Sequence, residues 1–501
     1  MSEVTTKKNI LKSSAIIGAA SLITIVIGLF KVKILAIVLG PSGIGIMGLL
    51  TSVMAAGATF FGLGLSRSGV RELALNSDNA IKFGHVQKAL TTGALLLGFL
   101  AVSVALVFRD NLSEWLFDSS DFHYAIAIIG FGIFFSLLSN SQTAVLQGLR
   151  KISDIAKVKV FSAAIAAVLG LILIWRLGED GVPAFIVLVP ISTFSVAYFY
   201  CRKHSKTSIK KSTLKDIFFE WNNLVKLGFV FMLTGLMAAS CQFIVRYIVN
   251  QELNIQSVGY FQAAWQISMT YISFILASMA VDYYPRLTQK IHDHEAANLL
   301  VNEQTEIAIS FSAPILLGML TFSPIIINIL YSNEFNVSSE ILRWQVLGDI
   351  FKIISWPLSF ILVAKGRSGL FFLTELTWNA TYILFVYFGI DIFGVEITGY
   401  AFAASYILYL ITIYLFTIKI NGFRWSKNNV KLIKLIIVVA IILLSLCYLN
   451  LIIAMFIGLI VCIYATVLAI RIITKLNIKN RKLDVLIGLY NSLSKKLTFK
   501  S

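Results

Sequence analysis

Residues 343–367 read RWQVLGDIFKIISWPLSFILVAKGR, and this stretch decides the class of the whole chain. From Trp344 to Ala364 it is apolar enough to cross a bilayer as one helix. It nevertheless carries Asp349 and Lys352, which a helix places on one face because they are three residues apart. A charge at bilayer depth is costly unless it faces a protein interior or a wet cavity. The stretch therefore predicts either an ion pair that helps this helix to pack or a polar cavity through which a charged molecule passes.

The composition of the rest of the chain agrees with a membrane protein. The 501 residues are 58% hydrophobic and only 13% charged, whereas soluble domains have about 25% charged residues. The first apolar run continues to Ala36, which is too long for a signal peptide and predicts a first membrane span. The four cysteines lie in or at the ends of apolar segments, so we expect neither disulfides nor a metal site. The fold class that we predict is an all-α polytopic membrane protein.

Fourteen apolar runs of membrane-spanning length predict how often the chain crosses the bilayer. We place the spans at 12–36, 43–66, 86–108, 122–147, 158–177, 182–201, 224–249, 257–282, 304–331, 343–364, 369–389, 395–418, 432–449 and 451–471. An even number of spans puts both termini on the same side.

The positive charges predict the orientation. Most of the 42 lysines and arginines fall near the two termini and in every second connection between the spans. Because such an excess marks the cytoplasmic side, we expect both termini in the cytoplasm. The net charge of +17 then reports orientation, and we expect no binding to nucleic acid.

Similar motifs at a nearly constant offset indicate an internal duplication. Residues 39–45 read LGPSGIG and open the second span, and residues 254–259 read NIQSVG and open the eighth. After the fourth and tenth spans come GLR at 148–150 and KGR at 365–367. Two six-helix lobes follow from this pattern, and transporters commonly place their site at such a repeat interface. The predicted divisions are an N-lobe at 1–201, a basic cytoplasmic linker at 202–223, a C-lobe at 224–420, and two further spans with a basic tail at 421–501.

Several charged residues inside or near the ends of spans are the candidate functional residues. Lys31 and Lys33 in the first span, Arg246 in the seventh and Lys352 in the tenth lie at similar depth and could form one positive cluster. Alternatively, side chains near the interface could reach the headgroups by snorkelling. We predict that Asp349 is the one acid deep within a span. It is either a structural partner of Lys352 or a site that couples transport to protons.

A second set of charges lies at the predicted cytoplasmic ends of spans. Asp282 and Arg286 are four residues apart, and so are Arg67 and Arg71. We expect that they form a cytoplasmic gate by exchanging ion pairs, although membrane anchoring is the simpler role for Arg67 and Arg71. There is no phosphate-binding loop of the kind that ATP-driven transport requires, and no catalytic constellation, so we expect no enzyme.

The motif around Trp344, Gly348, Asp349 and Lys352, together with LGPSGIG at 39–45 and ITGYAF at 397–402, resembles the Wzx flippases of O-antigen and enterobacterial common antigen synthesis. These belong to the multidrug/oligosaccharidyl-lipid/polysaccharide exporter superfamily. The resemblance covers roughly residues 10 to 420, and the last two spans depart from it.

The resemblance implies export of an undecaprenyl-diphosphate-linked oligosaccharide across the bacterial inner membrane, by alternating access through a central cationic cavity. It carries substrate roles to Lys31, Asp349 and Lys352, whereas Lys33 and Arg246 are added on charge and depth alone. It also implies contact with membrane lipids and suggests polysaccharide polymerase and chain-length proteins as partners. The alternatives are an organic-cation exporter of the same superfamily, or a membrane glycosyltransferase or polymerase. A cation exporter would need buried acids, and an enzyme would need larger outer loops.

Overall fold

The computed structural model describes residues 2–77, 79–204 and 213–475. Within these ranges the chain is almost entirely helical and contains no β-strand, which confirms the predicted all-α class. The helices are α1 (Ser2–Gly62), α2 (Leu65–Leu75), α3 (Ala80–Val107), α4 (Arg109–Phe117), α5 (His123–Gly148), α6 (Ile152–Leu177), α7 (Val182–His204), α8 (Leu214–Glu252), α9 (Ile255–Lys290), α10 (His294–Thr321), α11 (Ser323–Leu330), α12 (Val337–Ala364), α13 (Ser368–Phe393), α14 (Ile397–Asn421), α15 (Lys427–Leu449) and α16 (Leu451–Lys475), with short 3-10 turns η1 (Ser120–Phe122), η2 (Gly178–Gly181), η3 (Asn333–Phe335) and η4 (Gly394–Glu396).

Glycines divide the longest apolar stretches into separate spans. In the described part of the chain, nine helical stretches are long and apolar enough to cross a membrane, or ten if the bent pair α10 and α11 is one span. Three of them contain 47, 53 and 54 residues, more than twice the roughly 20 that one crossing needs. Each of the three is interrupted by a glycine with positive φ, namely Gly40, Gly178 and Gly394. Dividing these three gives twelve spans among the nine stretches, and the bent pair is the thirteenth. The remaining predicted span, 257–282, lies in α9, which is helical but is not one of these stretches.

The break at Gly40 follows from local chemistry. Its φ of 61° and ψ of −169° belong to a conformation that glycine adopts without steric cost. Pro41 comes next and begins the second half of α1, where its missing N–H is no loss. The sequence LGPSGIG thus ends one span and starts the next without a loop.

The predicted ninth span is bent by a proline-containing segment. α10 and α11 meet at an angle of 81° around Phe322. Pro314 stays inside α10, whereas Pro324 lies in the first turn of α11, where proline is tolerated. Of the two prolines in this span, only Pro324 therefore accompanies the change of direction.

The predicted linker at 202–223 is partly helical. α7 continues to His204, and α8 already begins at Leu214. Thr213 and Asp216 form a capping box at that N-terminus, with their side chains bonding to each other's backbone N–H, which stabilises the first turn. Residues 205–212 of the linker and 476–501 of the tail lie outside the described residues.

The chain forms two compact units, each made of more than one segment. The first contains 1–263, 327–338 and 383–398, and the second contains 264–326, 339–382 and 399–501. These units are not the two predicted lobes, because the first includes α8 and the start of α9. The division into duplicated lobes remains a prediction.

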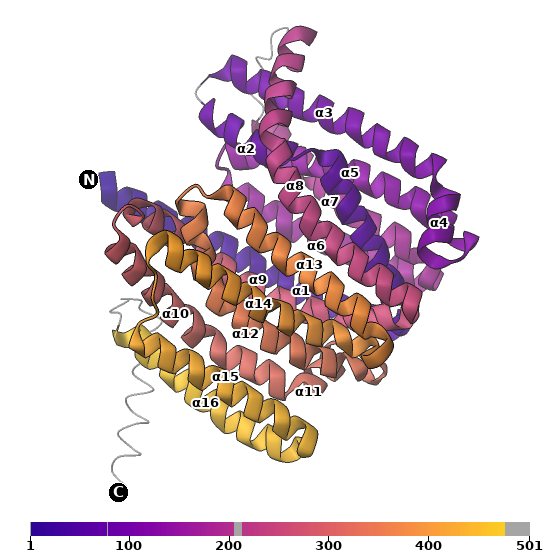
Figure 1. The fold of residues 1–501 in the computed structure, drawn as a ribbon. Helices are drawn as coiled ribbons and strands as arrows, with labels where there is room; N and C mark the ends of the chain where they lie inside the picture. The colour runs from indigo at the N-terminus through magenta and orange to yellow at the C-terminus, as the bar shows by residue number, and fades with distance from the viewer. Residues whose placement is uncertain (1, 78, 205–212, 476–501) are drawn as a thin grey trace, which may run out of the picture. The chain divides into compact units, whose positions relative to one another are not determined.

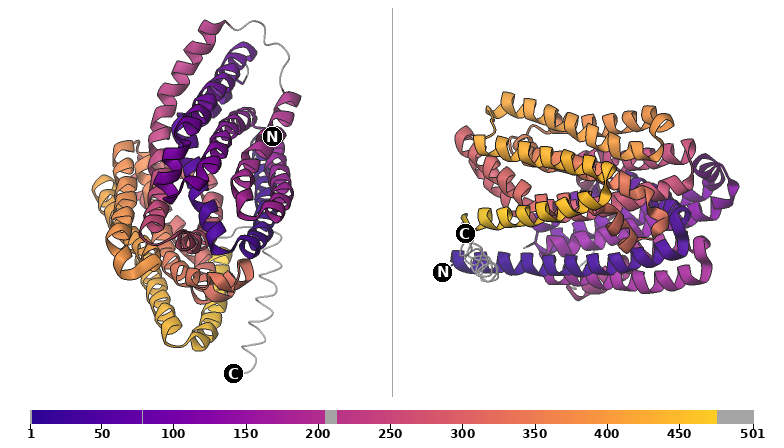
Figure 2. Two further views of the ribbon diagram at one scale, coloured as in Figure 1. Left: turned by 90° about the vertical axis from the view of Figure 1, so that its right-hand side faces the viewer. Right: turned by 90° about the horizontal axis from the view of Figure 1, so that it is seen from below.

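In the first unit, the helices pack side by side as a bundle (Figures 1 and 2). α5 packs against α3 and α7, and α1 packs against α6 and α8. Both α2 and α3 also contact α8.

In the second unit, α15 and α16 lie against α10 (Figure 1). Near Asn421, Asn298 and Asn302 of α10 bond to backbone and side-chain groups of residues 421–429. Farther along, Gly458 lies so close to Thr321 that a Cβ would be 2.4 Å from its side chain. The two additional helices are therefore joined to α10 by specific contacts at both ends.

Two glycines allow α1 and α9 to touch through their backbones. A Cβ at Gly45 would lie 1.9 Å from the carbonyl oxygen of Ile255, and a Cβ at Gly259 would lie 1.9 Å from that of Pro41. The contact is therefore reciprocal, and it joins the two motifs that suggested a duplication. Neither position has room for a side chain.

We expect Gly45→Ala to lower the thermal stability of the purified protein. The added methyl group forces the two backbones apart, and such overpacking typically costs about 1–3 kcal/mol. Gly28→Ala in the same helix is the matched control, since nothing lies within 4 Å of a Cβ there. Unfolding midpoints in one detergent measure the difference, and equal midpoints for the two variants would contradict the close contact.

Candidate transport site

Lys31 and Lys33 lie in the first half of α1 but have different surroundings. The amine of Lys31 lies 5.3 Å from the centre of the Phe185 ring. It forms no ion pair with any described carboxylate. The amine of Lys33 instead donates hydrogen bonds to the backbone carbonyls of Asn328, at 2.8 Å, and Tyr331. These carbonyls lie at the C-terminal end of α11, where a cation is favourable, so the contacts favour a structural role for Lys33.

Arg246 is buried, with only 5% of its surface exposed. Its guanidinium donates to the side-chain oxygen of Gln262 at 2.7 and 3.0 Å. It also donates to the backbone and side-chain oxygens of Gln242, at 2.8 and 2.9 Å. The ring of Phe261 lies 5.0 Å from the guanidinium carbon. Arg246 therefore does not snorkel to the interface but is held in a fixed orientation by amides.

Asp349 and Lys352 do not form the direct ion pair that their spacing suggests. Asp349 is fully buried and accepts a hydrogen bond of 2.5 Å from Ser268, while its other oxygen has no partner among the described residues. The amine of Lys352 lies 3.5 Å from the sulfur of Met269 and 5.4 Å from the centre of the Tyr406 ring. The carboxylate of Asp349 and the amine of Lys352 therefore interact electrostatically but do not form a salt bridge.

A second acid, which the sequence reasoning missed, belongs to the same group. Glu375 in α13 accepts a hydrogen bond of 2.9 Å from the hydroxyl of Tyr409 and interacts electrostatically with Lys352. Treating Asp349 as the single acid deep within a span was therefore wrong, since Glu375 lies in the predicted span 369–389. The sequence did contain a signal for Glu375, because a single acid within an apolar run is itself unusual.

We name Ser268, Asp349, Lys352, Glu375 and Tyr409 the carboxylate–lysine cluster. With all three charged groups ionised it holds two negative charges and one positive charge. Two acids of the same unit therefore compensate the positive charge of Lys352, whereas no described carboxylate forms an ion pair with Lys31. A bound cation or a proton would neutralise the remaining negative charge.

The four predicted gate residues have mostly local partners. Arg286 donates to Asp282 at 3.1 Å within α9, and both side chains are more than half exposed. Arg71 lies 3.5 Å from Glu72, its neighbour in sequence. Exposed pairs of this kind contribute little to stability. Arg67 differs, because its guanidinium lies 5.8 Å from the centre of the Phe231 ring and forms no ion pair or hydrogen bond with another described residue.

No metal centre is evident in the described part of the chain. It contains no group of three or more His, Cys, Asp and Glu side chains that could hold a metal ion. The chemistry of these sites is therefore that of cations, carboxylates and amides in an apolar surrounding.

A family model described as "Polysaccharide biosynthesis protein" matches residues 34–340. The match covers more than half of the chain. The chain belongs to this family. The matched region runs from the first half of α1 to the start of α12. It includes Arg67 and Arg246, but of the carboxylate–lysine cluster it includes only Ser268.

Curated relatives of this family member match most of its length. A lipid III flippase of Escherichia coli strain K12 is 24% identical over 412 residues, which cover 79% of this chain and 95% of the relative. A putative O-antigen transporter of Shigella flexneri is 22% identical over 366 residues, which cover 71% of this chain and 85% of the relative.

Solved structures establish the fold of this polysaccharide biosynthesis family member. The lipid II flippase MurJ in an inward closed conformation superposes with a TM-score of 0.70 at 16% identity, covering 91% of this chain and 98% of MurJ. A multidrug MATE transporter of the MOP superfamily, facing inward, gives a TM-score of 0.67 at 16% identity and covers 82% and 98%. The chain thus has the fold of these two transporters, and its apolar helices make it a multi-pass membrane protein.

Proposed function

We propose that the protein is a flippase for an undecaprenyl-diphosphate-linked oligosaccharide, such as an O-antigen or common-antigen repeat unit. It would move this lipid from the cytoplasmic to the periplasmic leaflet of the bacterial inner membrane, with both termini in the cytoplasm. The names of its relatives, a lipid III flippase and a putative O-antigen transporter, support the class of substrate.

The observation that carries the proposal is the environment of the Lys31 amine. Its amine lies inside a predicted span against an aromatic ring, and no described carboxylate neutralises it. A cation at that depth is normally retained for function. A diphosphate is a multivalent anion, and lysine and arginine are the usual groups that bind one.

The other predicted residues have different proposed roles. We propose that Arg246, fixed by its two glutamines, helps to bind the diphosphate in a central cationic cavity during alternating access. The role that we propose for Lys33 is structural, because its amine bonds to carbonyls at the end of α11. The proposed partners in addition to the lipid substrate are polysaccharide polymerase and chain-length proteins.

An organic-cation exporter is the second candidate, because the carboxylate–lysine cluster contains more acids than bases. Its excess acid is what a cationic substrate would require. The same excess acid also suits a coupling cation, so the cluster does not by itself distinguish the two functions.

A flipping assay tests the proposal. The protein is reconstituted into vesicles that contain a fluorescent undecaprenyl-diphosphate oligosaccharide, and a membrane-impermeant quencher reports the outer leaflet. We expect faster loss of protected fluorescence than in protein-free vesicles. If the lipid stays in its leaflet while a fluorescent organic cation is transported, the exporter is the correct function.

We expect Asp349→Asn and Glu375→Gln to remove the dependence of flipping on an ion gradient while lipid binding persists. Each substitution makes the cluster neutral and so removes the charge that attracts a cation. Flipping rates with and without imposed H⁺ or Na⁺ gradients measure this. Glu396→Gln, in η4, serves as a control. If the gradient dependence survives in both cluster variants, coupling does not occur at this cluster.

A further inference from the structure

Five helices of the first unit surround a pocket that none of the transport residues above explains. It has a volume of about 190 Å³ and is lined by parts of α1, α2, α3, α5 and α8. One buried water needs only about 10–15 Å³ of such space, so a phosphate-sized group can enter. Arg67 is the charged residue among those that line it, and none of them is acidic.

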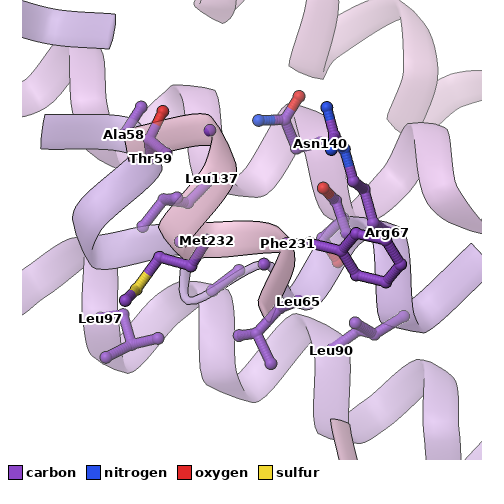
Figure 3. A pocket seen from close by; sticks show the side chains of 16 residues that line it. Ala58, Thr59, Leu65, Arg67, Leu90, Leu97, Leu137, Asn140, Phe231 and Met232 are labelled. Atoms are coloured by element: carbon purple, nitrogen blue, oxygen red, sulfur yellow. The ribbon is translucent and has the colours of Figure 1, made fainter. Parts of the chain in front are cut away.

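Three polar side chains at this pocket have unused hydrogen-bonding groups. In Figure 3, Arg67 and Asn140 extend toward each other beside the ring of Phe231. Neither forms a hydrogen bond or an ion pair through its side chain with another described residue. Ser141, next to Asn140, is only 3% exposed, and its hydroxyl oxygen has no partner in the described structure. Arg67 and Asn140 are exposed, so only the hydroxyl of Ser141 carries the cost of a buried polar group without a partner. A ligand in the pocket would satisfy this hydroxyl.

The start of α2 contributes to the same pocket. Gly64, Leu65 and Ser66 line it, and Gly64 is the residue before the first helical turn. Gly64 has no side chain that could cap this turn of an eleven-residue helix. The N–H groups of Arg67 and Ser68 donate to the carbonyl of Gly64, whereas those of Leu65 and Ser66 remain available at the positive end of the helix. Such a terminus favours an anion.

We propose that this pocket is a phosphate-binding site and that its ligand is the diphosphate of the lipid substrate. Arg67 would supply the charge and a planar pair of donors, while Ser141, Asn140 and the α2 terminus would donate to the remaining oxygens. In the proposed topology the pocket lies toward the cytoplasmic ends of these helices. It would thus capture the headgroup on the cytoplasmic side, separately from the contact with Lys31. This inference rests on the proposed flippase function.

Binding measurements on the full chain in nanodiscs of phosphatidylcholine test the site. The probe is fluorescent undecaprenyl diphosphate, with phosphatidylglycerol and inorganic pyrophosphate as competitors. We expect Arg67→Gln to weaken probe binding about 10- to 100-fold, because a hydrogen bond to a charged group is lost. The control is Arg202→Gln at the end of α7, an exposed arginine outside the pocket, for which we expect less than a twofold change.

Ser141→Ala separates a binding role from a structural one. Its hydroxyl has no partner in the described structure, so its removal should leave the unfolding midpoint unchanged or raise it. We nevertheless expect about a tenfold loss of probe binding. A lower midpoint with unchanged binding would overturn the proposal, and so would equal effects of Arg67→Gln and Arg202→Gln.

The competitors identify the source of the phosphate. Pyrophosphate should compete, and phosphatidylglycerol should compete at least tenfold less well than unlabelled undecaprenyl diphosphate. Equal competition by phosphatidylglycerol would overturn the assignment to the substrate and make the occupant a bulk-lipid headgroup. The flipping assay stays independent: wild-type protein that binds the probe but does not flip lipid contradicts only the proposed function.

Discussion

Lys352→Ala is expected to abolish transport while the protein still inserts into the membrane. Lys352 is the cation that interacts with both Asp349 and Glu375, and its loss leaves the buried Asp349 and the half-buried Glu375 uncompensated. Leaving a buried charge without its compensating charge typically costs about 3–5 kcal/mol, or at least about a 100-fold change in an equilibrium. Complementation of a flippase-null strain, with the amount of membrane-inserted protein measured in parallel, tests this prediction. Lys352→Arg should retain part of the activity.

A double variant shows why Lys352 is needed. We expect Lys352→Ala combined with Glu375→Gln to recover much of the lost thermal stability, because one acid is removed together with the base. Transport should remain absent if the lysine also acts during the transport cycle. Full activity of Lys352→Ala alone would contradict any essential role for this cation.

Arg246→Lys should reduce flipping more than tenfold, and Arg246→Ala should abolish it. The guanidinium of Arg246 donates to Gln242 and Gln262 through three of its nitrogens, a geometry that an ammonium group cannot reproduce. Each lost hydrogen bond to a charged group costs about 1.5–3 kcal/mol. Flipping rates and unfolding midpoints measured together separate loss of function from loss of folding.

Arg176→Lys is the matched control for Arg246. Arg176 is exposed at the end of α6, where its guanidinium lies 5.4 Å from the centre of the Trp175 ring, so lysine should replace it with less than a twofold change in rate. Equal behaviour of Arg246→Lys and Arg176→Lys would show that Arg246 needs only its charge.

Much of the fold was predictable because the bilayer imposes one rule on every span. An apolar run of about 20 residues must be helical there, since its backbone has no other hydrogen-bonding partners. The rule does not extend to the short helices α2 and α4, whose polar residues hide them from an apolar-run search. It also cannot locate the start of α8, which depends on a cap at Thr213.

The site was less predictable because depth and charge do not specify partners. Lys31 and Lys33 are two residues apart and look equivalent in sequence, yet one faces an aromatic ring and the other binds carbonyls of α11. Asp349 and Lys352 have ion-pair spacing, but Ser268 and Met269 of α9 occupy the nearest positions. Such contacts come from helices far away in the sequence.

The hydrogen bonds of Lys33 tie the first half of α1 to the end of α11. Because its amine bonds to the carbonyls of both Asn328 and Tyr331, we expect those two segments to move as one rigid body. The glycine-mediated break at Gly40 then becomes the natural pivot. Whatever rotation the second half of α1 undergoes, its first half stays anchored to a helix almost three hundred residues away along the chain.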